Sequence, residues 1–241
     1  MSYIEQQVEM LSEITEKPKD DILAEIQNSI KEGYSEPAAV MKWKSQHKKE
    51  LGAGESKDFM IRVIGKGELR EGDYGKYGYM GFLTYDGGVI ETKVASFSSS
   101  SLPKRELLEL GKVYQLKAFE KGDGTINRIK AIKEVDGETV PKVQELVAMD
   151  FKFKPLKDFD KYVGESHLFH GWVGRIIKSR DSGQIVGFEF GDEDTVIPAT
   201  FWIHCDAEVP EIEDGSELFV YAYVGMGRDG AVGNASGIFK A

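Results

Sequence analysis

The chain has 241 residues, 41% of them hydrophobic, and a formal net charge of −10. No apolar run approaches the ~20 residues of a membrane-spanning helix, so the composition predicts a soluble protein with no membrane partner. The acidic balance argues against binding nucleic acid through the whole surface, although a local basic groove remains compatible with it.

The N-terminal residues indicate where the protein is located, and the numbers of cysteines and histidines indicate whether it binds a metal. MSYIEQQVEM lacks a basic segment followed by an apolar one, so we expect no secretory signal and a cytoplasmic location. Cys205 is the one cysteine, which excludes an internal disulfide. The four histidines are scattered along the chain, and we therefore predict neither a zinc site nor any other cofactor.

Residues 1–52 have the apolar period of helices. Apolar side chains recur at spacings of three and four over 3–14 and again over 19–31. Gly33 is suited to end the second helix, and Ser35 is suited to N-cap a third one that stops at Gly52. The sequence predicts a three-helix N-terminal module, which we expect to contact replication or repair proteins.

After a short linker, GAGESK, the period changes to the alternation of β-strands. Strands are predicted at 59–63, 79–85, 89–97, 112–121 and 125–135, with a long loop at 65–78 and a helix within 98–110. Three strands, a helix and two strands in this order are typical of an OB-fold barrel. We assign the first OB-fold to residues 57–136.

A connector at 137–165 leads to a second set of strands at 166–241. The hairpin GFEFGDEDTVIPATFWI turns at its acidic residues, with Ile197, Ala199, Phe201 and Ile203 on one face and Trp202 on the other. The loop at 205–215 is too short and acidic for a helix, and strands at 217–226 and up to Phe239 follow. The predicted fold is mainly β, with two tandem five-stranded OB-fold barrels after the helical module.

The sequence carries no signature of an enzyme. It lacks a phosphate-binding glycine loop, a nucleophile elbow and a two-histidine zinc helix. Its paired carboxylates lie in predicted turns without apolar cover that would shift a pKa. We therefore expect a non-catalytic protein.

Aromatic and basic side chains share strand faces in both predicted barrels. Alternation places Gln115, Lys117 and Phe119 on one face, and a flexible Gly-Asp-Gly turn follows Lys121. Trp202 lies on the face opposite Phe201. Rings that stack on bases beside cations that neutralise phosphates are what single-stranded nucleic acid requires.

Three segments resemble the replication protein A family, particularly its archaeal single-stranded-DNA-binding members. FEFGDEDTVIPATFWI is similar to the hairpin of the second and third OB-fold strands, and LLELGKVYQLKAFEKGDGTINRIKAI to the helix end and last two strands. The helical segment EMLSEITEKPKDDILAEIQNSIKEGYSEPAAVMKW is similar to the one that precedes the first OB-fold. The resemblance implies that Trp202 and Phe97 are third-strand stacking aromatics and that Phe119 lies near a second stacking position. The zinc ribbon that some members of the family carry is not expected here, because the sequence has one cysteine.

We therefore predict a protein that coats or presents single-stranded DNA in replication, recombination and repair. The predicted stacking residues are Phe97, Phe119 and Trp202, and the predicted phosphate-binding residues are Lys66, Arg70, Lys93, Lys117, Lys121, Arg175, Lys178 and Arg228. Three alternatives stay open: the strand is RNA, the chain is an interaction subunit that binds no strand, or the three aromatic rings fill the barrels. An oligonucleotide of a few tens of residues would occupy both barrels, at ~4–16 nucleotides each.

Overall fold

The computed structural model describes residues 3–15, 17–47, 56–73, 75–121 and 123–241. These residues divide into two compact units. One comprises residues 1–57 with 119–124, and the other comprises 58–118 with 125–241. No helix in the described ranges is both long and apolar enough to cross a membrane.

The N-terminal unit contains α1 (Tyr3–Thr15), α2 (Lys19–Lys31) and α3 (Glu36–Gln46). Their apolar stripes meet in one core that includes Leu11, Ile22 and Trp43. Gly33 follows α2 with φ +97°, a conformation that glycine adopts without strain. The helix after Ser35 ends at Gln46, and the end predicted for it at Gly52 lies outside the described residues.

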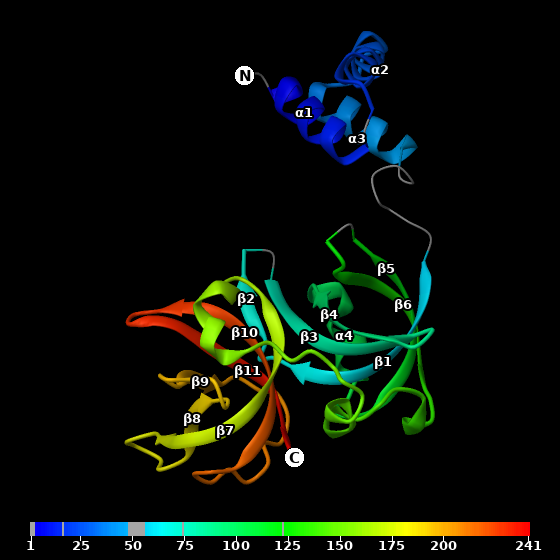
Figure 1. Cartoon of the computed structure of the whole chain (residues 1–241). Helices are drawn as coiled ribbons and strands as arrows, with labels where there is room; N and C mark the ends of the chain where they lie inside the picture. The colour runs from blue at the N-terminus through cyan, green and yellow to red at the C-terminus, as the bar shows by residue number, and fades with distance from the viewer. Residues whose placement is uncertain (1–2, 16, 48–55, 74, 122) are drawn as a thin grey trace. The chain divides into compact units, whose positions relative to one another are not determined.

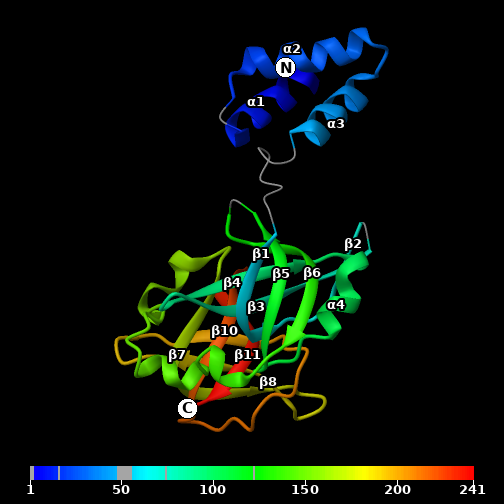
Figure 2. The same ribbon diagram turned by 90° about the vertical axis from the view of Figure 1, so that its right-hand side faces the viewer.

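The first barrel is built from β1 (Lys57–Lys66), β3 (Gly75–Asp86), β4 (Val89–Phe97), β5 (Val113–Glu120) and β6 (Ile126–Glu134). Their order is β1-β5-β6-β4-β3, and the pairing of β1 with β3 closes the barrel. Short strand β2 (Arg70–Gly72) extends the sheet beyond β3, inside the segment expected to be a loop. Figure 2 shows β1, β5 and β6 side by side.

The second barrel consists of β7 (Ser166–Lys178), β8 (Ile185–Gly191), β9 (Ala199–Ile203), β10 (Glu217–Gly227) and β11 (Gly230–Lys240). These strands close in the order β10-β11-β9-β8-β7. Phe188, Phe190 and Phe201 fill its interior, as their alternation predicts. The prediction of a mainly β chain with N-terminal helices and two five-stranded barrels is confirmed.

One local prediction is wrong. Ile197 does not share a strand face with Phe201, because β9 begins only at Ala199 and the Ile197 side chain is 82% exposed. Pro198 precedes β9 and has no N–H to donate, so the ladder starts after it. The Ser-rich turn and the helix expected within 98–110 are present as the 3₁₀ turn η1 (Ser99–Ser101) and α4 (Leu102–Glu106), which is shorter than the predicted segment.

The connector between the barrels holds the 3₁₀ helices η2 (Gly137–Thr139), η3 (Val143–Val147) and η4 (Leu156–Tyr162). Val143 and Leu146 from η3 are buried in a core that also contains Ile64 of the first barrel and Phe219 of the second. The connector therefore belongs to the packing between the two barrels. Figure 1 shows the barrels next to each other, with β10 and β11 near β1 and β3.

Candidate nucleic-acid interface

Tyr221 of the second barrel packs into a hollow in the first. Gly65 and Gly81 are paired across β1 and β3, so neither strand has a side chain there. A Cβ added to Gly65 would lie 2.3 Å from Tyr221 Cδ1, and one added to Gly81 would lie 2.1 Å from Cε1. The hollow exists because both positions are glycine, and the aromatic ring fills it.

A second close approach joins the backbones directly. A Cβ on Gly237 of β11 would lie 1.8 Å from the carbonyl oxygen of Ile64 in β1, so only glycine fits at this position. Gly67 and Cys205 form an antiparallel bridge between the barrels. The Glu68 amide also donates to the His204 carbonyl at 3.1 Å. The two barrels thus meet through main chain as well as side chains.

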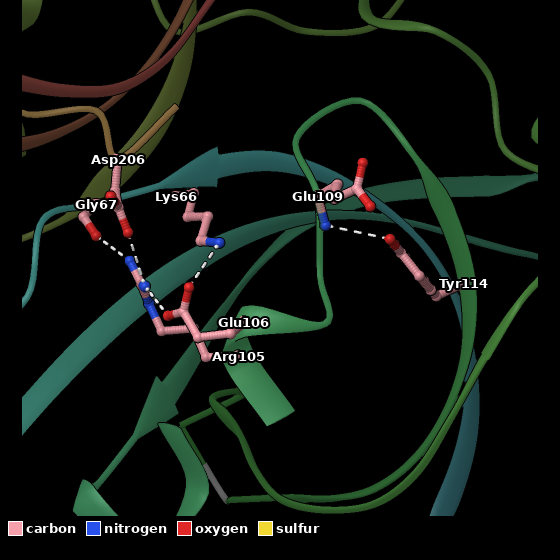
Figure 3. A network of polar contacts seen from close by, with 7 residues as sticks. All are labelled: Lys66, Gly67, Arg105, Glu106, Glu109, Tyr114 and Asp206. Atoms are coloured by element: carbon pink, nitrogen blue, oxygen red, sulfur yellow. Dashed lines mark hydrogen bonds and ion pairs between the residues drawn. The ribbon is translucent and has the colours of Figure 1, made fainter. Parts of the chain in front are cut away.

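A buried arginine completes the junction, as Figure 3 shows. Arg105 of α4 is 0% exposed and bonds to the Gly67 carbonyl oxygen, to Glu106 Oε1 at 2.7 Å and to Asp206 Oδ2 at 3.0 Å. Asp206 belongs to the second barrel, and its amide donates to the Lys66 carbonyl at 2.7 Å. Because a buried charge is costly unless it is paired, this network holds the barrels in one arrangement.

Lys66 is part of this junction. Its ammonium lies 3.3 Å from Glu106 Oε2, and the residue is 8% exposed. Burial raises the pKa of Glu106, but Arg105 and Lys66 outweigh it and leave that pKa below its ordinary value. The expectation that Lys66 is available to phosphates is therefore corrected, since its charge is already neutralised inside the protein.

A cleft of about 570 Å³ opens beside the junction and is lined by both barrels. The first barrel contributes the segment from Gly67 to Arg70 and the strand β3 with Tyr77 and Tyr79. The second contributes polar and aromatic residues from β7, β10, β11 and the segment after β9: Ser166, His204, Tyr221, Tyr223, Asn234 and Ser236. A cleft of this size is in the range of ligand-binding sites.

Four tyrosines line the cleft: Tyr77, Tyr79, Tyr221 and Tyr223. Tyr79 is 49% exposed and Tyr223 is 40% exposed, so each offers ring surface to a ligand. Tyr77 packs edge-on against Tyr79, with ring centroids 5.9 Å apart and an interplanar angle of 82°. Arg70 lies opposite Tyr77 in the pairing of β2 with β3, which places a cation next to the rings.

Two carboxylates at the cleft, those of Glu68 and Glu165, each have a histidine neighbour. His204 Nδ1 lies 3.0 Å from Glu68 Oε2, and His167 Nε2 lies 2.6 Å from Glu165 Oε2. Burial lowers the pKa of His167, and the Glu165 carboxylate only partly opposes this effect. Arg70 is exposed and forms no ion pair with any residue that the structure describes. It is the cation that the cleft presents to a ligand.

Strand register connects the cleft to Trp202. Tyr223 pairs with Asn234, Asn234 pairs with Trp202, and Trp202 pairs with Gly187, across β10, β11, β9 and β8. Paired residues share a sheet face, so these four positions form one row on the outer surface of the barrel. A Cβ on Gly187 would lie 2.9 Å from Trp202 Cε3, which shows that the indole covers this glycine. The cleft and the half-buried Trp202 ring therefore belong to one surface.

The other predicted aromatic residues lie elsewhere. Phe97 is 2% exposed in the core of the first barrel, among residues such as Phe82 and Leu116. The expectation that its ring is open to bases is corrected, because its position in β4 points it inward. Phe119 is half-buried near the end of β5 and belongs to the unit that contains the helices.

The predicted cations are spread over several surfaces. Lys93 lies 3.3 Å from Glu91, and Arg175 is paired with Glu189 on the outer face of β7 and β8. Lys117 and Gln115 are exposed on β5, in agreement with the predicted alternation. The remaining predicted cations are exposed in the turns or strand ends of the two barrels: Lys121, Lys178 and Arg228. The cleft itself brings together only Arg70 of this set.

Three tyrosines of the cleft were missed by the sequence analysis. Tyr221 and Tyr223 alternate with the inward residues Val220 and Ala222, so parity places both outside the barrel. Tyr79 lies in β3 between residues that are buried on both sides. The alternation of β10 could be predicted from the sequence. The surface of the first barrel that lies opposite these tyrosines could not.

The described residues contain no cluster of three or more histidine, cysteine, aspartate or glutamate side chains that could hold a metal ion. The Cys205 thiol donates to the Ser236 carbonyl at 3.1 Å, and burial raises its pKa to about 11. A thiol with this pKa is protonated at neutral pH and is a poor nucleophile or ligand.

No protein-family model matches the chain, and no curated protein matches it. Solved structures do resemble it. The HINa domain of Ifi202 in complex with 20-base-pair double-stranded DNA is 11% identical, with a TM-score of 0.43 over 78% of this chain and 96% of that one. A murine DNA-binding protein bound with double-stranded DNA is 8% identical, with a TM-score of 0.38 over 77% and 96%. A replication protein A heterotrimer bound to single-stranded DNA is 14% identical, with a TM-score of 0.40 over 76% and 50%.

Proposed function

We propose that this chain is a non-catalytic protein that binds single-stranded DNA. The strand would lie across the cleft and along the row of paired residues from Tyr223 through Asn234 to Trp202. The observation that carries the proposal is the gathering of exposed Tyr79 and Tyr223 rings with Arg70 around one cleft, on the same surface as the Trp202 indole. Unpaired bases expose their flat faces, and aromatic rings of a protein stack on them.

Stacking supplies most of the affinity in this proposal. Each ring that stacks on a base contributes about 1–3 kcal/mol, whereas a single arginine adds one salt-sensitive phosphate contact. The logarithm of the affinity should then fall with the logarithm of the salt concentration with a slope of roughly −0.7 per phosphate neutralised. With Arg70 as the cation in the cleft, we expect a shallow salt dependence.

The biological role that we propose is to coat or present single strands during replication, recombination and repair. The fixed junction supports this role, because a strand crossing the cleft would contact both barrels at once. The N-terminal helices would contact other replication or repair proteins, and no cofactor is required.

The test is a titration of a fluorescently labelled oligothymidine of about 30 nucleotides, a length that spans two OB-folds. Replacing Tyr79, Tyr223 or Trp202 singly by alanine should weaken binding about five- to hundredfold, as expected for one lost stacking partner. Tyr85→Ala is the matched control, because Tyr85 is an exposed tyrosine of β3 that does not line the cleft. Equal affinities for the wild-type protein and all three variants would refute the proposed surface.

Competition with an RNA oligonucleotide and with duplex DNA distinguishes single-stranded DNA binding from the alternatives. An RNA oligonucleotide of the same sequence reports whether the 2′-hydroxyl is tolerated, since only contacts to that group distinguish the two strands. A duplex of the same length reports whether stacking on unpaired bases is needed. A folded wild-type protein that binds none of these would favour an interaction subunit.

A further inference from the structure

The Tyr221 hydroxyl is a buried polar group that the packing does not explain. The side chain is 3% exposed, and its hydroxyl forms no hydrogen bond of normal geometry with a described residue, although the Ser166 side chain is close enough to oppose the rise in its pKa. The ring fills the hollow over Gly65 and Gly81, and a phenylalanine ring would fill it equally well. Leaving a buried hydroxyl without a hydrogen bond lowers stability.

Tyr221 is one of the residues that line the cleft. A Cβ on Gly81 would lie 2.4 Å from Tyr221 Cζ, the atom that carries the hydroxyl, and Gly81 and Tyr221 both line the cleft. Burial raises the pKa of Tyr221, and Ser166 only partly opposes this rise. The group therefore stays protonated at neutral pH and can both donate and accept a hydrogen bond.

Other neutral polar groups line the cleft beside it. Ser166 is paired with Tyr223 in the register of β7 and β10, and Ser236 lies on β11. Asn234 donates from Nδ2 to the Tyr223 carbonyl oxygen at 3.3 Å, which is its only side-chain hydrogen bond within the described part of the chain. Its second N–H and its side-chain carbonyl oxygen therefore have no hydrogen-bond partner among the described residues.

We propose that the cleft reads the edge of one base of the bound strand, with Tyr221, Ser166 and Asn234 as the groups that determine which base is preferred. This inference rests on the proposed function and adds base selectivity to it. The exposed Tyr79 and Tyr223 rings contact the flat faces of the bases, while the neutral polar groups meet the donors and acceptors at the edge of one base.

The physical basis is the cost of unpaired polar groups. A site whose polar groups hydrogen-bond one base cannot form the same hydrogen bonds with a base whose donors and acceptors are arranged differently. The polar groups of the site then stay unpaired, and the affinity for that second base is lower. Thymine and cytosine are nearly equal in size, but thymine presents an acceptor at O4 where cytosine presents an N4 donor. The preference between these two pyrimidines therefore reports hydrogen bonding at the edge more than stacking.

The experiment compares dissociation constants for oligothymidine and oligocytidine of equal length, measured with the full chain and with Tyr221→Phe. The wild-type ratio of the two constants should differ from one by about three- to tenfold, the worth of one net hydrogen bond. Tyr221→Phe should bring that ratio closer to one while affinity for the weaker oligonucleotide is retained. Tyr85→Phe is the control, because it removes a tyrosine hydroxyl from β3 outside the cleft.

The stability of Tyr221→Phe provides the second measurement. If the hydroxyl is unpaired in the free protein, its removal should leave the midpoint of urea unfolding unchanged or raise it. A lowered midpoint would assign the hydroxyl to the fold and overturn the inference. A wild-type ratio of one, or the same ratio in Tyr221→Phe, would also overturn it. Absence of binding to either oligonucleotide would instead refute the proposed function itself.

Discussion

Gly81→Ala tests the packing of Tyr221 into the first barrel. The added Cβ would lie 2.1 Å from Tyr221 Cε1 and 2.4 Å from Cζ. Carbon atoms in contact prefer ~3.5–4.0 Å, so the ring would have to withdraw by roughly 1.5 Å. The ring lies against Gly65 on the paired strand and is enclosed by the surrounding core, so it has no free space to move into. We therefore expect the added methyl group to push the second barrel away from the first.

Overpacking of a core usually lowers the free energy of unfolding by about 1–3 kcal/mol, and we expect the loss for Gly81→Ala to lie at the upper end of this range. A double-mutant cycle isolates its cause. Tyr221→Ala should itself cost about 3–5 kcal/mol, as for other large core rings, and it vacates the space that the new methyl group needs. Gly81→Ala added to Tyr221→Ala should then cost less than about 1 kcal/mol.

The assay is urea unfolding of the wild type, both single variants and the double variant, followed by far-UV circular dichroism. Gly174→Ala is the control, because a Cβ there would lie 3.8 Å from its nearest neighbour, the Glu189 carbonyl oxygen. If Gly81→Ala were as mild as Gly174→Ala, or if its cost were the same with and without the Tyr221 ring, the account of the junction would be refuted.

Two further predictions follow from pKa values. Cys205 has a pKa raised to about 11 from 9.0, so its thiolate fraction at pH 8 is about 0.1%, compared with about 10% in the unfolded chain. Alkylation by iodoacetamide should therefore be about a hundredfold slower in the native protein than in urea, and equal rates would contradict this burial. The folded-state pKa of Glu106 is lowered, so its ion pairs stabilise the fold above the ordinary carboxyl pKa, and this contribution is lost as the pH falls through the lowered value. Glu106→Gln should cost less than about 1 kcal/mol at pH 7, and this cost should shrink as the pH falls through the lowered pKa of Glu106; a cost that does not change with pH would contradict the assignment.

Local alternation was enough to predict the strands and the orientation of several side chains. Lys117 is exposed and Leu116 is buried on β5, and Phe201 is buried while Trp202 lies on the outer face of β9. These side chains follow the two-residue period of a strand, which depends on neighbouring residues only. For the same reason the helices at 3–15 and 19–31 were predicted close to their observed ends.

Properties that depend on distant residues were not predictable in this way. Lys66 has the composition of a surface cation, and it is buried because Glu106 and Asp206 come to it from elsewhere in the chain. The alternation of β4 is compatible with either direction for Phe97, and only the closure of the barrel points it inward.

The cleft is the clearest example of this limit. Tyr79 and Tyr221 are separated by most of a barrel, the connector and half of the next barrel, and the sequence gives no sign that they line one cavity. The glycines that let the barrels approach so closely have no side-chain pattern to detect. A tandem OB-fold was therefore predictable, whereas the shared surface of the two barrels required the structure.

The most direct test of the proposed function is the affinity of the wild type and of the Tyr79→Ala/Tyr223→Ala double variant for the same labelled oligothymidine of about 30 nucleotides. We predict saturable binding by the wild type and at least a tenfold weaker affinity for the double variant, whose unfolding midpoint should stay near that of the wild type because both rings are substantially exposed. A folded wild type that does not bind, or a double variant that binds equally well, would contradict the assignment of this cleft to single-stranded DNA.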